Sequence, residues 1–231
     1  MRSLWISLIR PIIDYCSPIW SPHPTNYGQI DRLEQVLRNF TKKVDNLEAL
    51  PYRERLKVMK LSSIQRRHER YKILYIYKIK EKLVPDLPSH SLSKKDLSLK
   101  FQPNPRTGTK CYPRGETLYH NPALIARNSS FALTASSLWN RLPACVSNIT
   151  NQPIQTFKRV LDSMLDIIPD DPRCDASGLY SDPNTGRYTN SIYHLIRVDN
   201  IKKAINDFNT DILHNPSHLG EGLLEAIPHP P

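Results

Sequence analysis

Basic side chains grouped in two short stretches are the residues of this sequence best suited to chemistry. Six of them recur at helical spacing: Arg38, Lys42, Lys43, Arg66, Arg67 and Arg70. Clustered arginine and lysine side chains bind the phosphate backbone of nucleic acids through charge, without reading the base sequence. The same side chains also keep an ordinary helical protein soluble. We therefore treat the six as candidate nucleic-acid contacts, although charge alone does not decide between these two roles.

Charge is unevenly distributed along the 231 residues, whose formal net charge is +10. Residues 1–83 contain 17 Lys and Arg against 8 Asp and Glu, a net charge of +9. Residues 169–231 contain 5 against 9, a net charge of −4. A basic front and an acidic tail favour a polyanion-binding part followed by a segment with another role.

Adjacent carboxylates are the second arrangement with chemical potential, because such pairs hold the metal ions of two-metal phosphoryl transfer. Asp170 and Asp171 form such a pair. Pro169 and Pro172 bracket it, and a residue without an N–H cannot contribute to the ladder of a central hairpin. We therefore expect no catalytic metal site at this pair.

Other reactive side chains are isolated in the sequence. His214 and His218 have i, i+4 spacing, but Pro216 breaks the helix that would align them. The cysteines form no close pair of the kind used by zinc sites and redox motifs; they are Cys16, Cys111, Cys145 and Cys174. We expect no bound cofactor and no small-molecule substrate.

The N-terminal stretch is apolar but does not resemble a secretory signal. Arg10, Pro11 and Asp14 interrupt it, and no run in the chain approaches the ~20 apolar residues that a membrane span requires. We expect an intracellular protein of the cytoplasm, the nucleus or both, not secreted, without membrane contact and with reduced thiols.

Hydrophobic spacing predicts the helices that must position the basic side chains. Apolar residues recur every three or four positions from Ile30 to Val44, which predicts an amphipathic helix beginning near Tyr27. The basic residues of this stretch lie outside the apolar face of the predicted helix. Pro51 suits the first turn of a short helix that carries Leu56.

The next predicted helix begins with a cap at Ser62 or Ser63 and runs to about Val84. Its middle is apolar nearly all round, which is typical of a helix buried on several sides. We expect its tyrosines and the three tryptophans to pack in the core rather than stack on bases; they are Tyr71, Tyr75, Tyr77, Trp5, Trp20 and Trp139.

At the N-terminus, Leu4, Leu8 and Ile12 share one helical face, with Pro11 interrupting near its end. Three later prolines, at positions 18, 22 and 24, rule out further helix and predict an extended connection to Asn26.

The remaining chain alternates irregular and helical segments. Prolines are frequent in residues 85–128, which we expect to form a linker with short strands near Leu97–Phe101 and Thr109–Tyr112. Helices are predicted near residues 130–140, 153–165 and 199–213. The predicted fold is mainly α, in four segments: a small helical bundle (1–84), a proline-rich irregular linker (85–128), a further helical region (129–168) and an acidic tail with one helix (169–231).

Five motifs in a defined order now carry a family resemblance. The first is Leu-x-x-Pro-Ile-x-Asp-Tyr-x-Ser-Pro-x-Trp over residues 8–20. The others are Leu-Glu-x-x-Leu-Arg at 33–38, a Tyr-Arg-Leu-Met-Leu pattern over 52–61, the arginine helix with Tyr-Lys-Ile over 66–79, and Trp-Asn-x-Leu-Pro at 139–143 with Phe-Lys-x-x-Leu-Asp at 157–162. Over residues 3–166 the chain resembles the C-terminal part of the reverse transcriptase of jockey-like non-LTR retrotransposons. One departure is that only a loose Arg106-Thr107-Gly108 or Arg114-Gly115 stands where the family's linker carries a Thr-Arg-Gly-like element.

The resemblance implies a helical polymerase thumb followed by a linker and C-terminal helices. It implies that the basic helices grip the backbone of an RNA template and DNA primer, and that a palm domain, missing here, is a partner. The palm would supply the catalytic carboxylates and Mg²⁺ of the full-length polymerase, so we expect this fragment not to be an enzyme.

Three other readings stay open from the sequence. The chain could be a nucleic-acid-binding module without catalysis, or a protein-interaction module whose acidic helix 199–213 docks a partner. It could also be a decayed open reading frame without a selected function.

Overall fold

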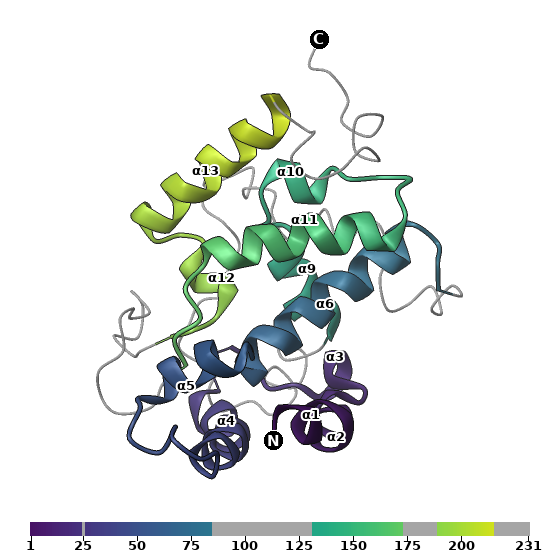
Figure 1. The fold of residues 1–231 in the computed structure, drawn as a ribbon. Helices are drawn as coiled ribbons and strands as arrows, with labels where there is room; N and C mark the ends of the chain where they lie inside the picture. The colour runs from purple at the N-terminus through teal and green to yellow at the C-terminus, as the bar shows by residue number, and fades with distance from the viewer. Residues whose placement is uncertain (25, 85–130, 173–188, 215–231) are drawn as a thin grey trace, which may run out of the picture.

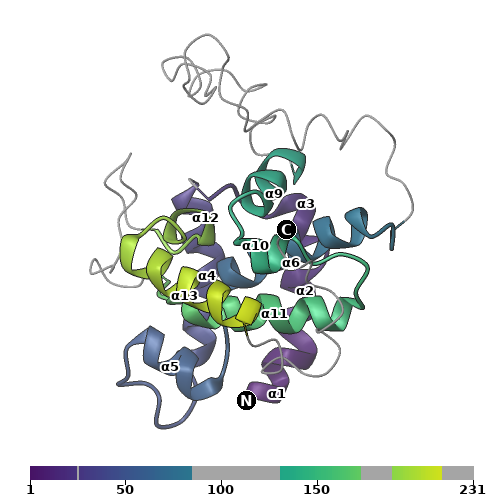
Figure 2. The ribbon, with the colours of Figure 1, turned by 90° about the horizontal axis from the view of Figure 1, so that it is seen from above.

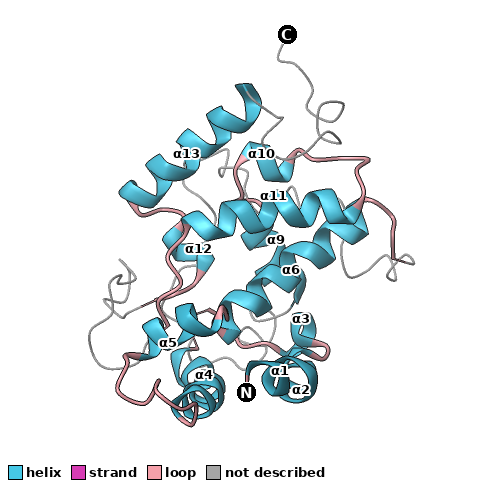
Figure 3. Ribbon diagram, in the orientation of Figure 1, coloured by secondary structure: helices cyan, strands magenta, loops and turns pink. Residues whose placement is uncertain are grey.

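The computed structural model describes residues 1–24, 26–84, 131–172 and 189–214. In these ranges every regular element is a helix and no strand occurs (Figure 3). The prediction of a mainly α fold is confirmed. The two strands predicted in the linker lie outside the described residues.

Three short helical pieces begin the chain, and they correct the prediction that prolines end helix here. They are α1 (Arg2–Leu4), the π-helical turn η1 (Trp5–Ile9) and α2 (Arg10–Asp14). Across the π turn the N–H of Arg10 donates to the carbonyl of Trp5, five residues earlier, and Pro11 falls in the first turn of α2. A wide turn of this kind and a first-turn position both spare proline the hydrogen bond it cannot make.

A second proline is accommodated in the same way. Cys16 adopts a left-handed conformation with φ of 51°, which ends α2 and turns the chain into α3 (Ser17–Trp20). Pro18 lies in the first turn of α3, where its missing N–H would have no intrahelical partner. The predicted extended connection is therefore a helix in this part.

The next three helices follow their predictions closely: α4 (Tyr27–Lys42), α5 (Tyr52–Met59) and α6 (Ile64–Lys80). The Asn26 side chain caps α4 by accepting from the Gln29 N–H. Ser63 caps α6, since its Oγ accepts from the Arg66 N–H at 3.1 Å. Lys60, with φ of 49°, ends α5 and reverses the chain toward α6.

The second half of the described chain contains α9 (Phe131–Trp139), α10 (Ala144–Ser147), α11 (Ile154–Ile167), α12 (Ile192–Leu195) and α13 (Asp199–His214). The three longer helices agree with the predicted ones within two residues at each end. The single-turn helices α10 and α12 were not predicted. None of the helices in the described part of the chain combines the length and apolar character that a membrane crossing requires.

Helix α6 lies at the centre of the molecule and joins two apolar clusters (Figure 1). Ile73, Ile76 and Tyr77 are buried with apolar residues of α9 to α13 in the larger cluster. Ile64, at the start of α6, is buried with Trp5 of η1 in the smaller one. Each fully buried side chain of this size stabilises the fold by about 1.5–3 kcal/mol relative to exposure. The prediction that this helix is touched on several sides is confirmed.

Aromatic packing in the larger cluster is partly as predicted. The rings of Tyr77 and Phe157 stack with centroids 3.9 Å apart, and Trp139 stacks on Phe157 at 5.9 Å. Trp5 and Trp139 are buried, as expected. Trp20 is 43% exposed, so its prediction as a core residue is wrong.

Residues 189–214 complete this core. The buried Glu69 carboxylate of α6 accepts from the Ser191 Oγ and from the Ile192 N–H at 2.7 Å, which fixes the start of α12. Burial raises the pKa of Glu69 even though both hydrogen bonds favour its charged form. Helix α13 buries Ile201 and Ile205 against the same core. Figure 2 shows α12 and α13 at the left of the molecule, with α1–α3 nearer its middle. The apolar face of the acidic-tail helix is therefore used within the chain, which does not favour partner docking through that face.

The N-terminal helices leave an apolar face uncovered. Leu4, Leu8 and Ile12 are exposed, with 77% of Ile12 accessible. Tyr15 and Ile19, in the next part of the chain, are each 75% exposed. The three leucine and isoleucine residues share one face, as predicted, but that face points away from the core.

Candidate nucleic-acid interface

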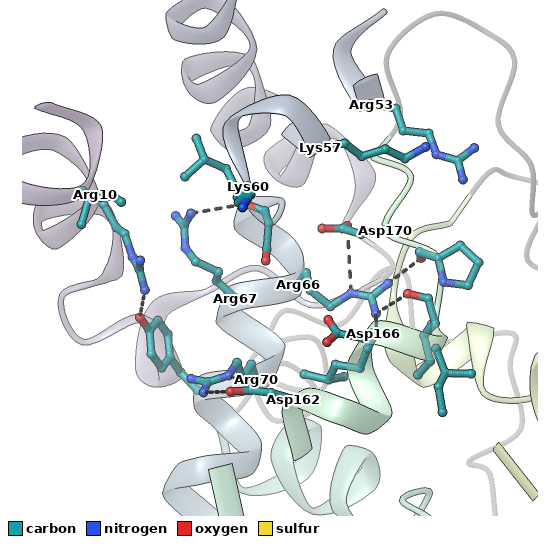
Figure 4. A pocket seen from close by; sticks show the side chains of 18 of the residues that line it. Arg10, Arg53, Lys57, Lys60, Arg66, Arg67, Arg70, Asp162, Asp166 and Asp170 are labelled. Atoms are coloured by element: carbon teal, nitrogen blue, oxygen red, sulfur yellow. Dashed lines mark hydrogen bonds and ion pairs between the residues drawn. The ribbon is translucent and has the colours of Figure 1, made fainter. Parts of the chain in front are cut away.

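A basic pocket lies beside the first half of α6, between the α5–α6 turn and the C-terminal end of α11 (Figure 4). Its volume is about 600 Å³. The eight basic side chains that line it outnumber the three acidic ones; they are Arg2, Arg10, Arg53, Lys57, Lys60, Arg66, Arg67 and Arg70, against Asp162, Asp166 and Asp170. Some of these basic side chains are paired with acceptors inside the protein, and others are not.

Arg66 is buried and binds the end of α11. Its guanidinium donates to the carbonyl of Ile168 at 3.2 Å and to that of Pro169 at 2.6 Å. The last carbonyls of a helix have no intrahelical donor and carry partial negative charge, so a cation placed there satisfies both needs. The Asp170 carboxylate lies 4.0 Å from the Arg66 Nε. Arg66 thus ties α6 to α11.

Asp14 gathers a second group of charges and ties α2 to α6. Arg10 Nε is 3.1 Å and Arg67 Nη2 is 3.2 Å from its carboxylate, and the Tyr71 hydroxyl donates to it at 3.2 Å. Burial alone would raise the pKa of Asp14, but the neighbouring His68, Arg67 and Arg10 lower it to about 2. The carboxylate therefore stays charged and neutralises the arginines around it.

Arg70 forms a bidentate ion pair with Asp162 of α11. Its Nε and Nη2 donate to the two carboxylate oxygens at 2.5 and 2.7 Å. Both side chains are partly exposed. Such a fork is the strongest form of the arginine–carboxylate pair, although water weakens it here.

The rim of the pocket is different. Arg53 and Lys60 have no hydrogen bond or ion pair from their side chains within the described part of the chain. Lys57 meets only Glu54, one turn away on the same exposed face, and Arg2 donates to the carbonyl of Met59. Positive charge at the rim is thus available to a ligand from solution.

Asp170 has a structural task. Its carboxylate accepts from the Ser63 N–H at 2.8 Å and the Ser63 Oγ at 2.7 Å, and from the Asn190 amide at 2.8 Å. The carboxylate therefore lies at the positive N-terminal end of α6. Across the described ranges, no group of three His, Cys, Asp or Glu side chains is arranged to hold a metal ion.

The six predicted contact residues separate into two places. Arg66, Arg67 and Arg70 meet in the pocket, but Arg66 and Arg67 are buried with internal acceptors. The expectation that Arg66 and Arg67 face a nucleic acid from the surface is therefore corrected: both side chains are buried.

The other three predicted residues lie on α4 or at its end, outside the pocket. Lys42 and Lys43 are exposed, and the guanidinium of Arg38 lies over the Tyr52 ring at 5.6 Å. Sequence reasoning missed the rim, although Arg53, Lys57 and Lys60 carried a signal. Their i, i+4, i+7 spacing places them along one side of α5 and its end.

Comparison with known proteins identifies no relative. No protein-family model, no curated protein sequence and no solved structure matches this chain.

Proposed function

We propose that this chain forms the thumb and downstream helices of a reverse transcriptase of the jockey-like non-LTR type, and that it holds the backbone of an RNA template–DNA primer duplex. The observation that carries this proposal is the basic rim of the pocket, where Arg53 and Lys60 stand without internal partners. Charge of this kind binds phosphates of any sequence and weakens steeply with salt.

The arginines that are paired inside the protein hold the pocket together rather than contact the ligand. Arg66 and Arg70 hold α11 against α6, and Arg67 holds α2 there through Asp14. These contacts fix the positions of α2, α6 and α11 around the pocket whose rim carries the free basic residues. A preformed site loses less conformational entropy on binding than a flexible one.

The uncovered apolar face of α1–α3 supports a second part of the proposal. Exposed Leu and Ile side chains along the N-terminal helices, among them Leu4, Leu8 and Ile12, are typical of a surface that packs on another domain. We assign it to the palm of the polymerase, which would provide the carboxylates and Mg²⁺ for nucleotide transfer. We assign this chain no chemical step, no small-molecule substrate and no membrane contact, and we place its work in the cytoplasm or nucleus.

Binding of a fluorescent RNA–DNA hybrid, measured by anisotropy at about 0.05 and 0.2 M salt, tests the proposal. The triple variant Arg53→Gln/Lys57→Gln/Lys60→Gln should lower affinity at least tenfold at the lower salt. It should also flatten the salt dependence by about two to three units of slope, because each lost phosphate contact removes about 0.9.

The matched control removes the same charge elsewhere. Arg197→Gln/Lys202→Gln/Lys203→Gln changes three exposed residues at α13 and the turn before it. It should keep affinity within about threefold, the nonspecific effect of lower net charge. Failure of the unaltered chain to bind the hybrid at low salt, or equal losses in both variants, would refute the proposal. The double variant Lys42→Gln/Lys43→Gln tests the contacts predicted on α4 in the same assay.

A further inference from the structure

A second pocket adjoins the basic one and has a different lining. Its volume is also about 600 Å³, and it shares Arg70 and Tyr71 with the first pocket. Three tyrosines and two lysines set its character: Tyr15, Tyr71, Tyr75, Lys78 and Lys158. A cavity of this size accommodates a small organic group, since ligand sites commonly enclose about 300–1,000 Å³.

The rings of this pocket are held by their own contacts. The Tyr71 hydroxyl bridges Arg10 and Asp14, which fixes that ring in the wall between the two pockets. Tyr75 packs edge-on against Phe131, with ring centroids 5.3 Å apart.

The ring of Tyr15 is the most exposed of the three. Its carbonyl accepts from the Trp20 indole N–H at 2.6 Å, which fixes the backbone beneath the ring. The residue as a whole is 75% exposed, so its side chain is largely accessible. An aromatic ring that a fold keeps at the surface is available for stacking.

The charges of this pocket favour an anion. Lys78 of α6 and Lys158 of α11 face it from two helices, and neither has an ion pair in the described parts of the chain. Asp14 is the one carboxylate in the lining, and Arg10 and Arg67 already neutralise it. A ligand that satisfies both features has flat rings and repeated negative charge.

We infer that the second pocket binds unpaired nucleobases of a single strand, with Tyr15 as the stacking surface and Lys78 and Lys158 on the flanking phosphates. Bases inside a duplex have their faces covered, so only a single-stranded segment offers rings to this pocket. Because Arg70 and Tyr71 line both pockets, a strand bound in the second pocket lies beside the basic one. The inference rests on the proposed function and adds to it a site for single-stranded template or primer beside the duplex.

Tyr15→Ala is the decisive variant, because the side chain is largely exposed and its loss should not disturb the fold. Binding of a short fluorescent single-stranded DNA should weaken about tenfold, within the range measured for loss of one stacking ring. Binding of the blunt RNA–DNA hybrid should stay within twofold. Tyr15→Trp should restore single-strand affinity, because it restores a flat ring of equal or larger area.

An abasic strand of the same length separates stacking from charge. The unaltered chain should bind it about tenfold more weakly than the base-containing strand, and Tyr15→Ala should remove that difference. Lys78→Gln/Lys158→Gln should weaken both strands alike. Equal binding of the two strands by the unaltered chain, or no effect of Tyr15→Ala, would overturn the inference. If hybrid binding persisted in that case, the proposed function would survive without it.

Discussion

The floor and the rim of the basic pocket use the same kind of side chain for opposite purposes. At the floor, Arg66 and Arg67 are buried, and carbonyls and a carboxylate accept from their guanidinium groups. At the rim, Arg53 and Lys60 keep their charge for solvent. A buried guanidinium without partners would be very costly, so the floor residues must bind within the protein. The contrast shows that density of positive charge in a sequence does not identify which cations bind a ligand.

The largest test of this contrast is Arg66→Gln against Arg53→Gln. Loss of the Arg66 guanidinium leaves the carbonyls at the end of α11 without a donor, so the free energy of unfolding should fall by about 3 kcal/mol. Arg53→Gln should change it by less than about 0.5 kcal/mol. Urea unfolding followed by circular dichroism measures both. Comparable losses in the two variants would remove the distinction between floor and rim.

Acid should weaken the ion pairs of Asp14 with Arg10 and Arg67, whereas the basic residues of the rim keep their charge. The pKa of Asp14 in the folded chain, about 2, lies below the ordinary 3.8, so its charge stabilises the fold above about pH 4. That contribution, of about 1–2 kcal/mol, should fade as pH falls from 4 toward 2. Asp14→Asn should lower stability at neutral pH and flatten this part of the curve. Asp45→Asn, at an exposed site after α4, is the control and should leave the curve unchanged.

The smallest expected effect belongs to the pair that lies between floor and rim. Arg70 and Asp162 are partly exposed, so a double-mutant cycle of Arg70→Gln and Asp162→Asn should give a coupling energy of about 0.5–1 kcal/mol. The coupling should shrink in about 1 M salt, because the pair is open to screening. A coupling of about 3 kcal/mol that ignores salt would place this pair with the buried floor instead.

Much of the fold followed from local patterns. The bounds of α4 and α13 and the start of α6 at its Ser63 cap agree with the predictions, because apolar periodicity and caps act within one or two turns. Helix α6 ends at Lys80, four residues before the predicted end near Val84. The N-terminal prolines were misjudged. A proline ends a helix only where its N–H is needed, and the π turn before Pro11 and the restart after Cys16 remove that need.

The candidate site was predicted only in part. The basic character of residues 1–83 and the arginine-rich start of α6 pointed to this side of the molecule. The arginines that have partners inside the protein are paired with Asp14, with Asp162 and with the end of α11, which come from distant parts of the chain. No local pattern indicates such pairing.

By itself the sequence determined the longer helices, the cap at Ser63, the buried middle of α6 and the family resemblance, since each depends on residues close together in the chain. The tertiary structure alone decided that residues 189–214 complete the core through Glu69, and that the apolar side of α1–α3 stays uncovered. It also decided which cations are free to bind. The physical reason is that burial and charge pairing are set by neighbours in space, and the main pairs here join residues that are far apart in the sequence.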